Sequence, residues 1–494
     1  MTSVEPIPGG RRRAVARGSV INSVFLVGLG ALNVLKAVIA ASFLSQAEFG
    51  IWSILFLGVG LLVGMKAAAV SDKYIQQDED DQELAFQRSF TLELISAGVL
   101  LVLSLVVAPV LALLYGRAEL IAPMMVLSTM LIGLALQAPI WVFQRRLDFL
   151  RQRLFLSVDP VVSFVVTVAL AAAGFGYWSL VAGAVAGSLV GGIVAVIASP
   201  YPLAWRLDRE TTRRYVSFSW PLVAAVGSAL LMGHISLLVG NLAIGIAASG
   251  AIGLAAIFAA YADRVDSVIT QAMYPAICRA VDDRATLQEA FEKSNRLALM
   301  WAIPFGVGMA LFAADLVGKV LGSEWEDALI LLQVFGLTAA FNHIGFNFGA
   351  FYRALGRTRP VAVVTVTAFG VFLAVSVPLT FAFGLDGLAA GTAVMCCVTL
   401  VLRGHYVLGL FPRFPVVRHV VRAIAPTVPA AAMVLIVRAV SNGGPRGDVE
   451  IVGELALYAA ITVVATLALE RSLLREMGSY LRPPVPAGAE ARAV

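Results

Sequence analysis

Residues 89–114 read SFTLELISAGVLLVLSLVVAPVLALL, a run of 26 mostly apolar residues. The hydrocarbon core of a bilayer is about 30 Å thick, and a helix of about 20 apolar residues crosses it. Because lipid offers the backbone no hydrogen-bond partners, a single segment that crosses must satisfy its own backbone as a helix. This stretch therefore predicts a transmembrane helix, and it is one of many.

The chain contains fourteen such stretches, which predict an all-α integral membrane protein with about 14 transmembrane helices. Its composition agrees, with 60% hydrophobic and 14% charged residues, whereas soluble domains average about 45–50% and about 25%. The mean hydropathy is +0.88. The predicted spans are residues 18–43, 49–69, 89–114, 120–143, 154–173, 177–198, 218–242, 250–273, 297–320, 328–351, 361–383, 388–410, 420–440 and 451–469.

Positive charges are distributed unevenly over the two faces of this arrangement. When the spans are threaded alternately and residues near span ends are assigned to the adjacent face, 29 of the 36 Lys and Arg lie on one side and four on the other. Short loops rich in Lys and Arg stay in the cytoplasm, so both termini are predicted to be cytoplasmic. The same bias explains the net charge of +5 and argues against nucleic acid as a partner. Three cations remain inside the spans: Lys36, Lys66 and Arg264.

A weak internal repeat divides the first twelve spans into two sets of six. QELAFQRS (82–89) and QEAFEKS (288–294) follow spans two and eight, while LVAG (180–183) and LAAG (388–391) open spans six and twelve. The offset of about 205–208 residues corresponds to an even number of spans, which gives a parallel repeat of a kind that transporters use. We expect two six-helix lobes around a central cavity, followed by two further helices. The expected parts are a cytoplasmic tail (1–17), an N-lobe (18–205), a C-lobe (206–412), spans thirteen and fourteen (413–470) and a disordered cytoplasmic tail (471–494).

Polar side chains at membrane depth are expensive and mark functional sites by default. In the first span, Asn22, Asn33 and Lys36 fall within about 60° of the helix surface, as a polar stripe. Lys66 lies near the cytoplasmic end of the second span. The alternative for each lysine is that it extends to the headgroups, outward for Lys36 and inward for Lys66.

The eighth span is the most polar of the fourteen. Asp263, Arg264 and Asp266 share one arc of this helix. These charges either neutralise one another and fix the span to a neighbour, or they place Arg264 in a water-filled cavity with the aspartates beside it. His234 in the seventh span is either a packed, hydrogen-bonded residue or a member of the same site.

The repeat relates spans one and two to spans seven and eight, so a two-fold axis would gather Lys36, Lys66, His234 and Arg264 around one cavity. Fixed cations in such a cavity suit an anionic substrate, because Arg and Lys are natural phosphate partners. We therefore predict that Arg264, Lys36 and Lys66 bind substrate. Asp263, Asp266, His234 and Asn33 are predicted to support them or to couple an ion. No cofactor or metal is expected, and coupling to protons or sodium ions is left open.

Motifs for enzyme chemistry are absent from the sequence. It has no Walker A motif, which disfavours ATP-driven transport by this chain alone, and no HExxH or GxSxG pattern. Cys278, Cys396 and Cys397 lack paired metal or redox spacing and predict neither a disulfide nor a metal site. A membrane glycosyltransferase or polymerase, the alternative from another class, would need a substantial outer loop, and the predicted outer loops are short turns. We therefore expect a transporter and not an enzyme.

Five short motifs resemble those of bacterial polysaccharide-unit flippases. They are EFGIWS (48–53), GFGYWSLV (174–181), MYPA (273–276), LGSEW (321–325) and ALGR (354–357). Over about residues 18–410 the chain resembles the Wzx and colanic-acid-exporter type of the polysaccharide transporter family, which belongs to the MOP superfamily.

The resemblance implies two six-helix lobes that form a V around a central cavity. It implies alternating access that moves an undecaprenyl-pyrophosphate-linked oligosaccharide across the bacterial inner membrane for exopolysaccharide or lipopolysaccharide biosynthesis. Partners would be membrane lipids and a polysaccharide polymerase with its co-polymerase. Cavity cations would hold the pyrophosphate, Arg264 foremost, with Lys36 and Lys66 beside it.

Two alternatives within transport stay open. Many relatives have twelve spans, and the two additional spans predicted here are also found in lipid II flippases, so a peptidoglycan-precursor flippase is one alternative. A MATE-like cation-coupled exporter is the other, although acidic residues would then be expected to dominate the cavity.

Overall fold

The computed structural model describes residues 9–67, 70–76, 79–146, 148–209, 212–213, 232–279, 281–357, 359–441 and 446–475, and helices dominate throughout. The helices of the first half are α1 (Gly9–Phe43), α2 (Gln46–Ala67), α3 (Val70–Gln76), α4 (Gln82–Tyr115), η1 (Ala118–Leu120), α5 (Ile121–Ser128), α6 (Met130–Leu136), α7 (Ile140–Arg145), α8 (Phe149–Ala172) and α9 (Trp178–Ile197). A helix at Met232–Ala243 follows. The later helices are α11 (Ile246–Arg279), α12 (Arg284–Asp315), η2 (Leu316–Leu321), η3 (Ser323–Ala328), α13 (Leu329–Asn342), α14 (Phe348–Ala354), α15 (Arg359–Val371), η4 (Phe372–Ser376), α16 (Val377–Leu410), α17 (Val416–Ile424), α18 (Val428–Val440) and α19 (Asp448–Leu469).

The predicted all-α membrane class is confirmed. Among the described residues, ten helices are long and apolar enough to cross a bilayer, or eleven if α17 and α18, bent by 44°, form one span. One of the ten, Arg359–Leu410, contains two predicted spans, and Gly384 (φ 65°, ψ −140°) interrupts its helical backbone. After Gly384 the chain folds back, and Gly391 therefore packs closely against Ser376. The predicted seventh span lies largely outside the described residues, so the total of fourteen stays a prediction.

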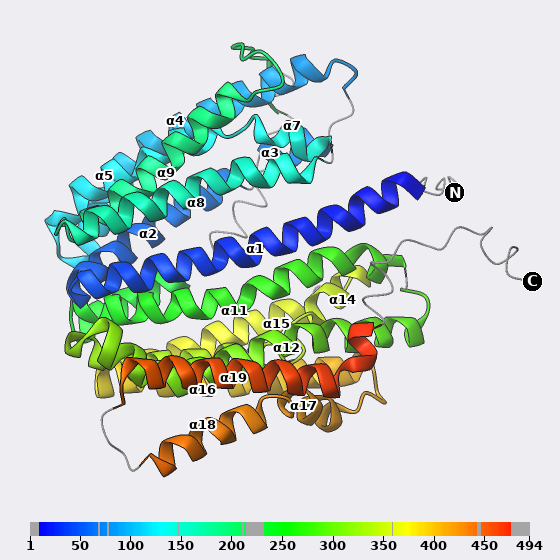
Figure 1. The fold of residues 1–494 in the computed structure, drawn as a ribbon. Coiled ribbons are helices and arrows are strands. Elements are labelled where there is room, and N and C mark those ends of the chain that lie inside the picture. Colours follow the sequence, from blue (N-terminus) through cyan, green and yellow to red (C-terminus); the bar gives the residue numbers. More distant parts are fainter. Residues whose placement is uncertain are drawn as a thin grey trace, which may run out of the picture.

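Two groups of helices lie on either side of α1 (Figure 1). Helices α4, α5, α8 and α9 form one group, and α11 to α16 form the other. The two groups lie close together at the end of α1 that leads into α2. They diverge toward the side that holds the first turn of α1 and the last turn of α19, which gives the outline of a V.

The repeated sequence opens equivalent helices in the two groups. Asp81 caps α4 by accepting the backbone N–H of Leu84 at 3.0 Å. Asp283 caps α12 in the same way, with Ala285 at 3.0 Å and Thr286 at 3.3 Å. The hydroxyl and backbone hydrogen bonds from Thr286, together with that from Ala285, hold the pKa of the Asp283 carboxyl below its usual range. The weak sequence match therefore marks the start of α4 in one group and of α12 in the other.

Helices α2 and α11 join the two groups through small residues. A side chain at Gly50 would collide with the backbone carbonyl of Ile246, and one at Gly250 would collide with that of Gln46. Ser53 fills the equivalent gap opposite Gly253. Glycine permits this close backbone approach because it lacks a Cβ atom, so the two helices cross almost in backbone contact.

Candidate functional site

Arg264 and Asp263 are neighbours on α11 that face different partners. The aliphatic stem of Arg264 lies beside α1, with its Cγ 3.8 Å from where a Cβ atom at Gly30 would stand. The Asp263 carboxylate is 68% exposed and lies 3.6 Å from Nε2 of the buried His343 at the end of α13. Arg264 therefore lies at the contact between α1 and α11, which we call the junction, while Asp263 lies beside His343 of the second group.

Lys36 points away from Arg264, into the first group of helices. Its ammonium donates a hydrogen bond to Ser163 Oγ of α8 at 3.0 Å. Gly30, which touches the Arg264 stem, lies six residues earlier on α1, about 9 Å along the helix axis. Asn33 lies half-buried between these two points. The structure thus places Lys36 and Arg264 on different sides of α1.

Of the remaining predicted residues, the structure describes the side chain of His234 but not those of Lys66 and Asp266. His234 is half-buried, and its Nε2 lies 3.1 Å from the carbonyl of Leu57 on α2. Tyr115 donates a hydrogen bond to the carbonyl of His234 at 3.4 Å. The side chains of Lys66 and Asp266 lie outside the described part of the structure, so their proposed roles rest on sequence alone.

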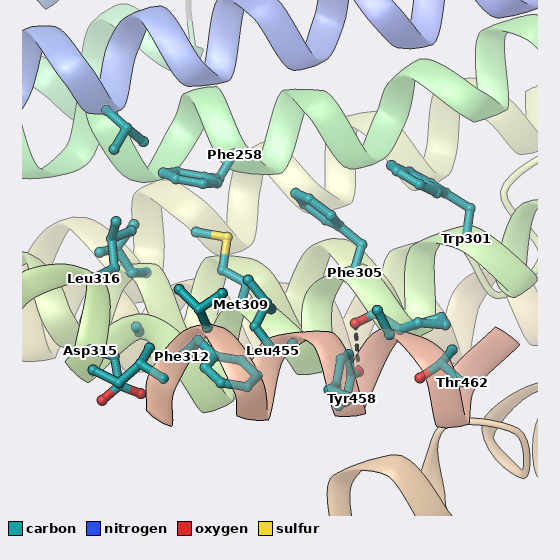
Figure 2. Close-up of a pocket in the computed structure, with 18 of the residues that line it drawn as sticks. Phe258, Trp301, Phe305, Met309, Phe312, Asp315, Leu316, Leu455, Tyr458 and Thr462 are labelled. Atoms are coloured by element: carbon teal, nitrogen blue, oxygen red, sulfur yellow. Dashed lines mark hydrogen bonds between the residues drawn. The ribbon is translucent and has the colours of Figure 1, made fainter. Parts of the chain in front are cut away.

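A large apolar groove runs beside this junction (Figure 2). It has a volume of about 910 Å³ and lies between α12 and α19, with Val38 of α1 and Phe258 of α11 at its inner wall. Its long walls are built from aromatic and aliphatic side chains, including Trp301, Phe305 and Leu455. Charged residues are confined to the end of α12 and the start of α19, where Asp315, Lys319 and Asp448 lie. A long hydrocarbon chain fits such a groove better than a polar solute does.

An aromatic cluster connects the groove to Arg264. The Tyr261 ring packs edge-on against Trp301 and Phe305, with centroids 5.5 and 5.2 Å apart. The Tyr261 ring packs against Gly30, so closely that a Cβ atom at Gly30 would come within 2.7 Å of the ring. Its hydroxyl donates to the carbonyl of Val27 at 3.4 Å. The same patch of α1 therefore contacts both Arg264 and Tyr261, the ring that packs against the groove wall.

Ion pairs hold both ends of the groove together. At one end, Arg438 of α18 pairs with Asp315 of α12 and Glu454 of α19, each at 2.9 Å. Arg446 pairs with the same two buried acids. At the other end, Glu470 pairs with Arg296 of α12 and with Arg422 of α17, the latter at 3.1 Å.

Between these ends, Tyr458 of α19 donates to the carbonyl of Pro304 at 2.7 Å (Figure 2). Helix α19 is therefore bound to α12 at three levels. Its position beside α12 follows from polar contacts as well as apolar packing.

Sequence reasoning missed a second polar centre, around Asp159 of α8. Gln137, which ends α6, donates its amide to Asp159 Oδ2 at 3.0 Å. Ser163, the partner of Lys36, lies one turn further along α8. The signal was present, because Asp159 lies inside the predicted span 154–173.

These features define a polytopic α-helical membrane protein with a two-sided transporter architecture. Comparison with solved structures supports that class. The inward-closed lipid II flippase MurJ superposes with a TM-score of 0.67 at 13% identity, covering 92% of this chain and all of that chain. An inward-facing multidrug resistance MATE family transporter of the MOP superfamily gives 0.59 at 13% identity, covering 79% of this chain and 99% of that chain. At these identities the likeness shows the fold, which is that of the MOP superfamily.

A sequence model for the family described as "Polysaccharide biosynthesis protein" matches residues 39–330. The chain belongs to this family, and the predicted resemblance to polysaccharide transporters of the MOP superfamily is confirmed.

Two relatives are similar over different lengths. The succinoglycan biosynthesis transport protein ExoT of Rhizobium meliloti (strain 1021) is 23% identical over 487 residues, which cover 94% of this chain and 95% of ExoT. The probable low-salt glycan biosynthesis flippase Agl15 of Haloferax volcanii is 25% identical over 191 residues, 38% of each chain.

Proposed function

We propose that this protein is a flippase that moves a polyprenyl-pyrophosphate-linked oligosaccharide across the bacterial inner membrane by alternating access. The names of ExoT and Agl15 support transport of a glycan precursor. The positive-inside bias supports cytoplasmic termini. Divergence of the helix groups toward the side of the termini supports a state that is open to the cytoplasm.

One observation carries the proposal: a cation at the junction of the two groups adjoins a long apolar groove. Arg264 lies on one side of the Gly30 and Tyr261 contact, and Trp301 and Phe305 of the groove wall lie on the other. A molecule with an anionic headgroup and a long hydrocarbon tail would use both. The Arg guanidinium would hold the pyrophosphate through paired hydrogen bonds, and the groove would take part of the tail.

The proposal is a transport function without covalent chemistry. The side chains at the junction offer hydrogen bonds and charge to a substrate, and a flippase needs no bond broken. A glycan polymerase and its co-polymerase would be the partners that use the translocated unit. Lipid II carries the same polyprenyl pyrophosphate, so it differs from the proposed lipid-linked oligosaccharide only in its sugar portion.

The test is replacement of Arg264 in a strain whose own copy of the gene is deleted. We predict that Arg264→Ala abolishes polysaccharide export while the lipid-linked precursor accumulates, and that Arg264→Lys retains part of the activity as a point charge. The measurement is surface polysaccharide together with extracted precursor, at matched membrane levels of protein. Arg284→Ala is the control, because this exposed arginine at the start of α12 lies away from the junction. Full export by Arg264→Ala at normal protein level would disprove the assignment.

A further inference from the structure

The centre around Asp159 places a carboxylate, an ammonium and an amide together at membrane depth. Gln137 donates to Asp159, and Lys36 donates to Ser163 one turn away on the same helix. The Lys36 ammonium is therefore held one helical turn from Asp159, through its contact with Ser163. A carboxylate inside a membrane protein is a functional candidate by default, and its partner is the first question.

Helix α9 closes this centre on one side. A Cβ atom at Gly187 would come within 2.7 Å of Asp159 Oδ1, and one at Gly191 within 3.0 Å of the Gln137 amide nitrogen. Any residue larger than glycine would displace the polar side chains. The sequence of α9 therefore leaves room for Asp159 and Gln137 and for little else.

On another side, the centre adjoins a pocket lined by both polar and apolar side chains. This pocket has a volume of about 270 Å³, and its lining includes Glu93, Gln137, Gln144 and Gln152. Gln137 belongs to both, as part of the pocket wall and as the donor to Asp159. The pocket lies beside α3, α7 and the start of α8, in the Arg-rich half that we assign to the cytoplasmic side. The polar side chains in its wall can bind water in a space of this size. Such water would give protons a route as far as Gln137, which contacts the carboxylate.

We propose that Asp159 is a proton-binding residue that couples proton uptake to substrate binding, with Lys36 as its counter-charge. The proposal rests on the flippase function proposed above. With Asp159 ionised, the Lys36 ammonium is held at α8. When an anionic pyrophosphate attracts Lys36, Asp159 loses its counter-charge at membrane depth and takes a proton from the pocket water. Proton and pyrophosphate then favour each other's binding, and linkage makes this reciprocal.

The chemistry of the centre favours a proton over a metal cation. Gln137 turns its donor amide, not its carbonyl, toward Asp159. A hard metal ion needs several oxygen ligands. The described residues contain no cluster of His, Cys, Asp and Glu arranged to hold a metal. Among the described groups, Lys36 faces Asp159 from α1, the neutral Gln137 faces it from α6, and glycines face it from α9, while Glu93 of α4 lines the adjoining pocket.

The first arm of the test detects the proton without any substrate. The full-length protein in lipid nanodiscs is titrated by infrared difference spectroscopy. We expect a protonated-carboxyl band that appears on acidification, is lost in Asp159→Asn and is kept in the control Asp282→Asn, which replaces an exposed loop carboxylate. An unchanged band in Asp159→Asn would overturn the proposal.

The second arm measures binding of undecaprenyl pyrophosphate and the accompanying proton uptake in weak buffer. We expect uptake approaching one proton per bound lipid and affinity that rises by about tenfold per unit fall in pH at that limit. Asp159→Asn should bind without pH dependence. The Lys36→Met variant should take up no proton on binding, although Asp159 is present. This second variant keeps the test valid if Asp159→Asn folds poorly.

The outcomes separate the two proposals. Binding with no proton uptake, or binding that depends on sodium instead of pH, would overturn the role of Asp159 and leave the flippase function intact. Absence of any binding to undecaprenyl pyrophosphate would instead count against the flippase function, while the infrared arm still decides whether Asp159 binds a proton.

Discussion

At the scale of single residues, the two cations that the sequence singled out have different neighbours. Arg264 lies at the junction beside the aromatic wall of the groove, whereas Lys36 donates to Ser163, one turn from Asp159 on α8. We therefore assign Arg264 to the substrate headgroup and Lys36 to the link between headgroup and proton. Periodicity had placed Lys36 on a polar stripe, but it could not say which helix that stripe would face.

A single side chain in the groove tests whether the groove carries substrate. Ala459 of α19 lines the groove, and we predict that Ala459→Trp fills part of it and slows export. With a lipid tail in the groove, the added indole would overpack it, which costs about 1–3 kcal/mol and corresponds to about 5- to 150-fold in affinity. The measurement is the export rate at matched protein level.

Ala460→Trp serves as the matched control for this change. Ala460 is the next residue of the same helix, is exposed and does not line the groove. Equal export by the two tryptophan variants would show that the groove is not used.

At the scale of elements, α17 to α19 are tied to the second group by charge. Asp315 and Glu454 are both buried, and each accepts hydrogen bonds from Arg438 and Arg446. Buried acids are costly unless their partners remain. The pairs therefore fix the position of α19 beside α12 and with it the width of the groove.

Removing one arginine should loosen these elements. We predict that Arg438→Leu destabilises the protein by about 3 kcal/mol, toward the low end of the range for a broken buried pair because Arg446 remains. Thermal unfolding in detergent would measure the change. Arg471→Leu, at an exposed position after α19, should alter stability by less than about 0.5 kcal/mol. Similar melting curves for the two variants would contradict the structural role of Arg438.

At the scale of the whole molecule, the V depends on one close helix crossing. Gly50 and Gly250 let α2 and α11 touch where the two groups meet. Alternating access would require this contact to open and re-form, so bulk placed there should trap one state.

We predict that Gly50→Val forces the helices apart, with a packing cost of about 1–3 kcal/mol, and reduces export to background while the protein still inserts. Export and membrane level are the readouts. Gly60→Val lies on the same helix with open space around the position and should retain export. Normal export by Gly50→Val would mean that the crossing does not need to close.

Much of this architecture follows from the sequence by itself. The length of apolar runs such as 89–114 determines that the chain spans a membrane, since burial in lipid depends on local composition and length. The bias of Lys and Arg predicts its orientation, and the repeat predicts two equivalent sets of helices. Arg264 stands out because any charge in an apolar run is visible without a structure.

The tertiary structure alone decided which polar groups meet. The pairs Lys36 with Ser163 and Arg438 with Asp315 are separated by more than a hundred residues, and Gln137 lies 22 residues from Asp159, across α7. Such contacts depend on how helices pack, and helical periodicity fixes only the face on which a residue lies. The groove between α12 and α19 is a property of that packing too. The sequence by itself thus determined which charged residues lie inside apolar spans, where burial is costly. The tertiary structure decided which partner compensates each charge.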